Sequence, residues 1–166
     1  MKSTFCVITV CLITACGQQP KVERKPNGKV MQSHQATLKQ SSESLLRHLE
    51  IDYKMTGKSE SLQKIDSIAC SSDGDLSEQI AVVAVNAFKA NNARFIKATV
   101  SKKLLCIEQA FVMGMSEEIS VLPRNERAGV LSKFQISVDK SLAELSQDER
   151  SHAKNLIRQI NPQVFD

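Results

Sequence analysis

Apolar side chains from residue 36 onward recur three and four positions apart instead of alternating. This spacing places them on one face of an α-helix. The first stretch covers residues 35–55 and ends at Gly57, a common residue just past a helix. A shorter stretch over residues 59–69 stops at a Ser-Ser-Asp-Gly break. The apolar positions of these two stretches are Leu38, Leu45, Leu46, Leu49, Tyr53, Leu62, Ile65 and Ile68.

The second half of the chain continues in the same way. Asp75 followed by Glu78 has the spacing of a capping box and predicts the start of a helix. After Asn91-Asn92, the pattern predicts one long helix whose stripe is Ile96, Val100, Leu104, Ile107, Phe111 and Met115. Past Pro123, another stripe is formed by Val130, Leu131, Phe134, Val138, Leu142 and Leu145. Ser146 and Glu149 repeat the capping spacing and introduce a last helix, which Asn161-Pro162 closes.

These stripes predict an all-α fold, a small bundle of about five helices over residues 36–166. Composition agrees with this interpretation. The chain has 166 residues, 42% of them hydrophobic, with no Trp, one Tyr and six Phe, so one core built mostly of aliphatic side chains is expected. The formal charge of +4 is a mild excess and does not indicate a nucleic-acid-binding protein.

The N-terminus, MKSTFCVITVCLITACG, has a different character. One cation at Lys2 precedes an apolar stretch over residues 5–15, which small residues and a cysteine follow. This is the layout of a signal peptide. As a helix the stretch would be roughly 16 Å long, whereas crossing the hydrocarbon core takes about 20 residues, so it is too short for a permanent anchor.

The sequence Leu12-Ile13-Thr14-Ala15-Cys16 resembles the lipobox of bacterial lipoproteins. The resemblance implies a signal peptide over residues 1–15, cleavage before Cys16, and lipid, including palmitate, on that cysteine. Two or three acyl chains hold a protein to a membrane essentially for good. Gly17 is not the Asp that commonly retains such proteins at the inner membrane, so the resemblance favours the outer membrane. The alternatives are a secreted protein cleaved near Ala15 or an uncleaved anchor.

Residues 16–35 contain Pro20, Pro26 and Asn27-Gly28, with few apolar residues. They read as a flexible, basic tether between the lipid and the helical domain.

Cys70 and Cys106 remain once Cys16 carries lipid and the signal peptide is removed. Export would bring this pair to an oxidising compartment, where we expect a disulfide between the second helix and the long helix. The alternative is two unpaired buried thiols.

Candidate chemistry is sparse in the sequence. His34, His48 and His152 are scattered, and Glu149, one turn from His152, reads as part of a solvated helix face. The carboxylate neighbours at 117–118 and 148–149 would project apart on helices. We therefore predict no catalytic residues, no metal site and no cofactor, and we expect that the protein is not an enzyme.

A tethered helical domain without catalytic spacing is expected to act by contact. The first hypothesis is a protein-interaction module with a partner in the cell envelope, within a larger envelope machine. The plan is similar to that of secretion pilotins, although only in architecture. Alternatives are an exclusion or immunity lipoprotein, and a protein that binds a lipid or small apolar ligand between its helices.

Overall fold

The computed structural model describes the backbone of residues 28–166 and the side chains of residues 41–166. This part of the chain is all-α, as predicted, and contains no strand. Its elements are α1 (Gly28–Thr56), α2 (Ser59–Ala69), α3 (Gly74–Ala90), α4 (Asn92–Lys102), α5 (Leu105–Ser120), α6 (Arg124–Ser141), η1 (Leu142–Glu144), α7 (Gln147–Arg158) and η2 (Pro162–Phe165). With seven α-helices and two short 3₁₀ helices, the expected count of about five was too low.

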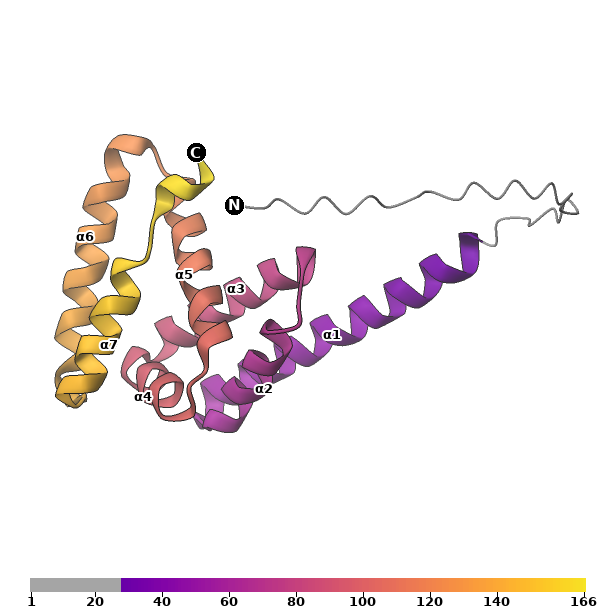
Figure 1. Ribbon diagram of the computed structural model, residues 1–166, viewed down its shortest axis with the longest axis horizontal. Helices are drawn as coiled ribbons and strands as arrows, with labels where there is room; N and C mark the ends of the chain where they lie inside the picture. The colour runs from indigo at the N-terminus through magenta and orange to yellow at the C-terminus, as the bar shows by residue number, and fades with distance from the viewer. Residues whose placement is uncertain (1–27) are drawn as a thin grey trace, which may run out of the picture.

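Helices α1 and α3 run in the same direction and pack on each other, and α2 runs the chain back from the end of α1 toward the start of α3 (Figure 1). Two amide groups of α3 fix their register. Gln79 donates to the carboxylate of Glu43 over 2.9 Å, and two turns further along both helices Asn86 donates to Glu50 over 3.0 Å. The seven-residue step in both helices is the spacing of a coiled-coil-like seam.

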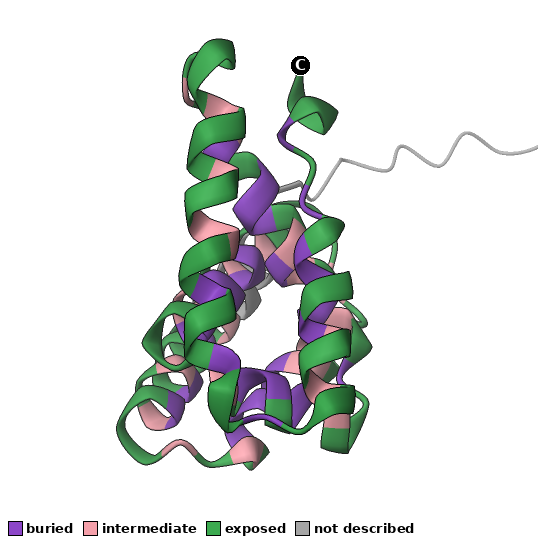
Figure 2. Ribbon diagram, turned by 90° about the vertical axis from the view of Figure 1, so that its left-hand side faces the viewer, coloured by how far each residue is buried: buried purple, intermediate pink, exposed green. Residues whose placement is uncertain are grey.

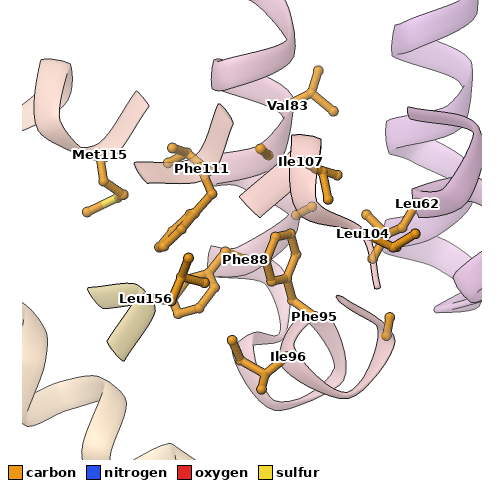
Figure 3. Close-up of a cluster of buried hydrophobic side chains, with 14 of the residues drawn as sticks. Leu62, Val83, Phe88, Phe95, Ile96, Leu104, Ile107, Phe111, Met115 and Leu156 are labelled. Carbon is orange, nitrogen blue, oxygen red and sulfur yellow. The ribbon is translucent and has the colours of Figure 1, made fainter. Parts of the chain in front are cut away.

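The core gathers around three phenylalanine rings. The ring of Phe88 stacks on that of Phe111 with centroids 4.4 Å apart and meets the edge of Phe95 at 5.5 Å. Figure 3 shows these rings between side chains of several helices, with Leu156 of α7 closing one side. Apolar burial of this kind is the main favourable term in folding.

The predicted long helix over residues 96–115 is two helices, α4 and α5, and that prediction was wrong. Lys103 adopts the left-handed conformation with φ of 54°. Its N–H donates to the carbonyl of Val100, and the N–H of Leu104 donates to that of Thr99. This is a Schellman ending, in which a lysine takes the place usually held by glycine. The apolar stripe continues across the break because Leu104 and Ile107 are both buried.

Two capping boxes were predicted, and one forms. Ser146 and Glu149 bond each other's backbone amides at the start of α7. The same contact also lowers the pKa of the Glu149 carboxyl, chiefly through the backbone hydrogen bond from Ser146. Asp75 and Glu78 form no box, because α3 begins at Gly74, whose φ is +51°, and its N-cap is Asp73, two residues before the predicted cap. Asp75 therefore lies inside the first turn, where a carboxylate faces the positive end of the helix dipole.

Helix α6 is mostly exposed. Only Val138 of its residues is fully buried, and Val130, predicted to be in the core, is 37% exposed. In Figure 2, where α6 and α7 face the viewer, both helices are exposed along their outer sides. Leu45 of α1 was likewise placed in the core by its spacing and is 48% exposed.

Helix α1 begins at Gly28, upstream of the expected start near residue 35, so it overlaps the end of the predicted tether. The predicted signal peptide and Cys16 lie outside the described residues. None of the described helices is both long enough and apolar enough to cross a bilayer.

Candidate functional site

A groove open to solvent runs along α5, between α3, the end of α2 and η2 at the C-terminus. Its volume is about 410 Å³. The apolar part of its lining consists of Ala69, Ile80, Ala81, Ala110, Met113 and Phe165. We call this surface the α3–α5 groove.

One face of α5 runs along the α3–α5 groove. Cys106, Ala110, Met113 and Glu117 follow one another three or four residues apart and all line it. This spacing places them along one side of the helix. Met113 is 50% exposed. The groove is therefore the side of α5 that core packing leaves open.

Phe165 of η2 also lines the groove and is 43% exposed. The chain before it is tied to α5, because the backbone N–H of Asn161 donates to the Ser116 hydroxyl over 2.9 Å. That hydroxyl donates in turn to the carbonyl of Val112 over 2.7 Å. These bonds hold the C-terminal segment against the buried side of α5.

Arg127 secures the chain beyond Phe165. Its guanidinium donates to the carboxylate of Asp166 over 2.6 Å, and to the backbone carbonyls of Leu122 and Ser120 near the end of α5. The hydrogen bond from Arg127 lowers the pKa of the Asp166 carboxyl, and the charge of Arg124 acts in the same direction. Phe165 is thus fixed from both sides.

The rim of the α3–α5 groove is negative, although the whole chain carries a net charge of +4. Glu78 of α3 and Glu117 of α5 line it, and both are exposed. Among the described residues, neither carboxylate has an ion-pair or hydrogen-bond partner. Both are free to meet a cation from outside.

A second groove, between α1 and α3, is larger at about 590 Å³. Its carboxylates are already engaged, since Glu43 and Glu50 accept from Gln79 and Asn86, and Glu50 also pairs with Lys54. We therefore regard the α3–α5 groove as the better candidate for a contact with another molecule.

Cys106, which lines the α3–α5 groove, lies beside Cys70. The sulfur atoms of Cys70 and Cys106 lie 2.05 Å apart, at disulfide-bond distance, with their Cα atoms 5.3 Å apart. Such a bond would join the end of α2 to the first turn of α5.

Asp66 completes a group of three potential metal ligands with these cysteines, all within 4.8 Å of one another. Its carboxylate already accepts the backbone N–H of Ile107 over 2.9 Å and so caps α5 from a neighbouring helix. Because bonded sulfur atoms are not thiolate ligands, the geometry describes a capped helix end rather than a metal centre.

The histidines do not converge. His34 lies outside the residues whose side chains are described, and His48 is exposed. His152 pairs with Glu108 of α5 over 2.7 Å, rather than lying on a solvated face with Glu149. The exposed fraction of the Glu108 side chain is 8%, so this contact joins α7 to a buried carboxylate.

The carboxylates that are neighbours in the sequence, at 117–118 and 148–149, make different contacts. Glu118 pairs with Lys89 at 2.6 Å, whereas Glu117 lines the groove. Asp148 is exposed, and Glu149 caps α7.

No protein-family model, curated protein or solved structure matches this chain.

None of the expectations drawn from the sequence pointed to the α3–α5 groove. Its signal was Met113, an apolar residue that does not belong to the stripe of Ile107, Phe111 and Met115. Phe165 lies past Asn161-Pro162, beyond the last element that the pattern predicts. An apolar residue off the core stripe is a sign of contact with something else, although single exposed apolar residues are common.

Proposed function

We propose that this protein is a lipid-anchored lipoprotein of the bacterial envelope whose helical domain binds a partner protein through the α3–α5 groove. The observation that carries the proposal is the pair of half-exposed apolar side chains, Met113 and Phe165, in one groove with a charged rim. The anchor is proposed from the lipobox-like sequence ending at Cys16, and the outer membrane from Gly17.

The shape of the groove favours a protein over a small ligand. Small-molecule sites bury most of their ligand in a concave pocket, whereas this groove stays open to solvent between exposed helices. A binding surface for a protein needs apolar anchors with a polar rim around them. Covering the exposed parts of Met113 and Phe165 would contribute on the order of 1 kcal/mol each.

The anchor is tested by labelling cells with radioactive palmitate. The wild-type protein should incorporate label and sediment with membranes, and Cys16→Ala should do neither. Cys11→Ala is the matched control and should behave as the wild type. Continued labelling of Cys16→Ala would disprove the lipobox interpretation.

The contact is tested by photo-crosslinking in intact cells. A benzoylphenylalanine at Gln109, which is exposed in the groove, should give one discrete adduct with another protein. The same group at Ser132, exposed on α6, is the control. Met113→Asp should reduce the Gln109 adduct, because it places a charge among the apolar contacts. Equal adducts at both positions, or none at Gln109, would contradict the proposal.

The remaining hypotheses predict other outcomes of the same experiment. A lipid or small apolar ligand would give a Gln109 product that is heavier by only the mass of that molecule, with no second protein attached. An exclusion or immunity lipoprotein, a pilotin-like escort and another part of an envelope machine all require a protein adduct, and the identity of the crosslinked protein separates them.

A further inference from the structure

We infer that the occupant of the α3–α5 groove is one amphipathic helix of the partner protein, with apolar side chains against Met113 and Phe165 and Lys or Arg at its edges. This inference rests on the proposed function and names the kind of partner. Three features of the groove support it: its walls, its length and its charge.

The walls of the groove are helices. Their backbone N–H and C=O groups are bonded within α3 and α5, so the groove offers no strand edge to which an extended peptide could add. A bound strand would leave its own backbone groups unpaired wherever it is covered, at a cost for each group. A helix satisfies its backbone internally, which is why helices bind grooves of this kind.

The length of the groove suits a helix of about three turns. The face of α5 that lines the groove, from Cys106 to Glu117, extends roughly 16 Å at 1.5 Å per residue. A partner helix would present apolar residues at positions i, i+3 or i+4, and i+7 over this distance. Phe165, held by the contacts of Asn161 and Asp166, supplies a further apolar contact from η2.

The charge of the rim selects a cationic helix. Glu78 and Glu117 are exposed and have no partner within the described part of the chain, so a Lys or Arg on either edge of the occupant would gain a counter-charge. Exposed ion pairs of this type are weak individually, but they orient the partner and exclude acidic ones. The same carboxylates disfavour phosphate-bearing lipid headgroups.

The inference is tested by photo-crosslinking of the full chain in intact cells, with the crosslinker at Gln109. Neutralising the rim with E78Q/E117Q should lower the adduct yield about fivefold, and reversing it with E78K/E117K should lower it more than tenfold. E126Q/E144Q is the matched control, because it removes two exposed carboxylates outside the groove and should leave the yield unchanged. Sequencing of the crosslinked peptide should show apolar residues at helical spacing flanked by Lys or Arg.

The outcomes separate the two proposals. The cationic-helix inference is overturned if neither rim variant changes the adduct yield, if the crosslinked peptide is acidic, or if it comes from a second copy of this chain. In each of these cases the groove still binds a protein, so the proposed function stands. The absence of any wild-type adduct at Gln109 overturns the proposed function and this inference with it.

Discussion

Gly114 of α5 packs on the backbone of Ala81 in α3. A Cβ atom at Gly114 would lie 2.8 Å from the carbonyl oxygen of Ala81 and 2.9 Å from Cγ2 of Val85. Since a backbone carbonyl in a helix cannot move aside on its own, this glycine sets how closely α5 approaches α3. The contact therefore determines the shape of the groove between the two helices.

Gly114→Ala should destabilise the fold, because the added methyl group forces two packed helices apart. We expect a loss of about 1–3 kcal/mol in the free energy of unfolding, measured with urea. Gly129→Ala is the matched control. A Cβ at Gly129 would meet nothing within 4 Å, so alanine there should stabilise α6 by up to about 1 kcal/mol. Equal effects of the two substitutions would show that the close approach at Ala81 is unimportant.

The cysteine pair predicts a redox-dependent stability. The sulfur atoms of Cys70 and Cys106 are at bonding distance with a sequence separation of 36. A disulfide closing such a loop contributes about 4 kcal/mol in the chain-entropy model. Dithiothreitol should therefore lower the free energy of unfolding of the mature protein by that order, and it should slow its migration on non-reducing gels.

Cys70→Ser/Cys106→Ser provides the control for this measurement. Its stability should equal that of the reduced wild type and should not respond to dithiothreitol. Two thiols that alkylate without prior reduction in the native protein would rule out the bond.

Signals within a few neighbouring residues predicted the local structure well. Contacts between residues far apart in the sequence could not be predicted from it. The Ser146 and Glu149 capping box lies within one turn, so it was readable from spacing alone. The break between α4 and α5 has no such signal, because Lys103 occupies a position where glycine is expected. The cap that Asp66 gives to Ile107 comes from a different helix. Only the folded chain brings these groups together.

The α3–α5 groove could not be predicted from the sequence for a related reason. Apolar spacing places every helical stripe in the core. This is correct for Phe111, which is buried, but it gives no role to Met113, which lies on another side of α5 and is 50% exposed. Exposure of an apolar residue is decided by which helices pack around it, and that information is not local. The rim residue Glu78 was interpreted as half of a capping box, whereas it lines the α3–α5 groove.

The contact between His152 and Glu108 should be important for stability. Glu108 is buried, and the imidazole of His152 at 2.7 Å is its hydrogen-bond partner. His152→Ala would leave a buried carboxylate unpaired, at a cost of about 1–3 kcal/mol. Thermal or urea unfolding measures this loss. His48→Ala, at an exposed position, should change the free energy of unfolding by no more than about 0.5 kcal/mol. Similar effects at both histidines would contradict a specific role for the pair.

Tyr53 offers a spectroscopic test of burial. Its hydroxyl has no hydrogen-bond partner in the described part of the chain. Burial raises its pKa to about 12, although the positive charge of Arg94 acts to lower it. The chain has one Tyr and no Trp, so phenolate absorbance near 295 nm reports this residue alone. The native protein should titrate near pH 12, and the urea-unfolded chain near pH 10.

The raised pKa of Tyr53 also makes the free energy of unfolding depend on pH. Because the unfolded chain ionises Tyr53 first, its contribution to stability is complete below pH 10 and is lost as the pH rises toward 12. Tyr53→Phe removes a buried hydroxyl without a partner, so it should be as stable as the wild type at pH 7 or more so. Its advantage should grow between pH 10 and 12. A native titration near pH 10, with no divergence between the two proteins, would mean that solvent reaches the phenol and that α1 does not seal this part of the core.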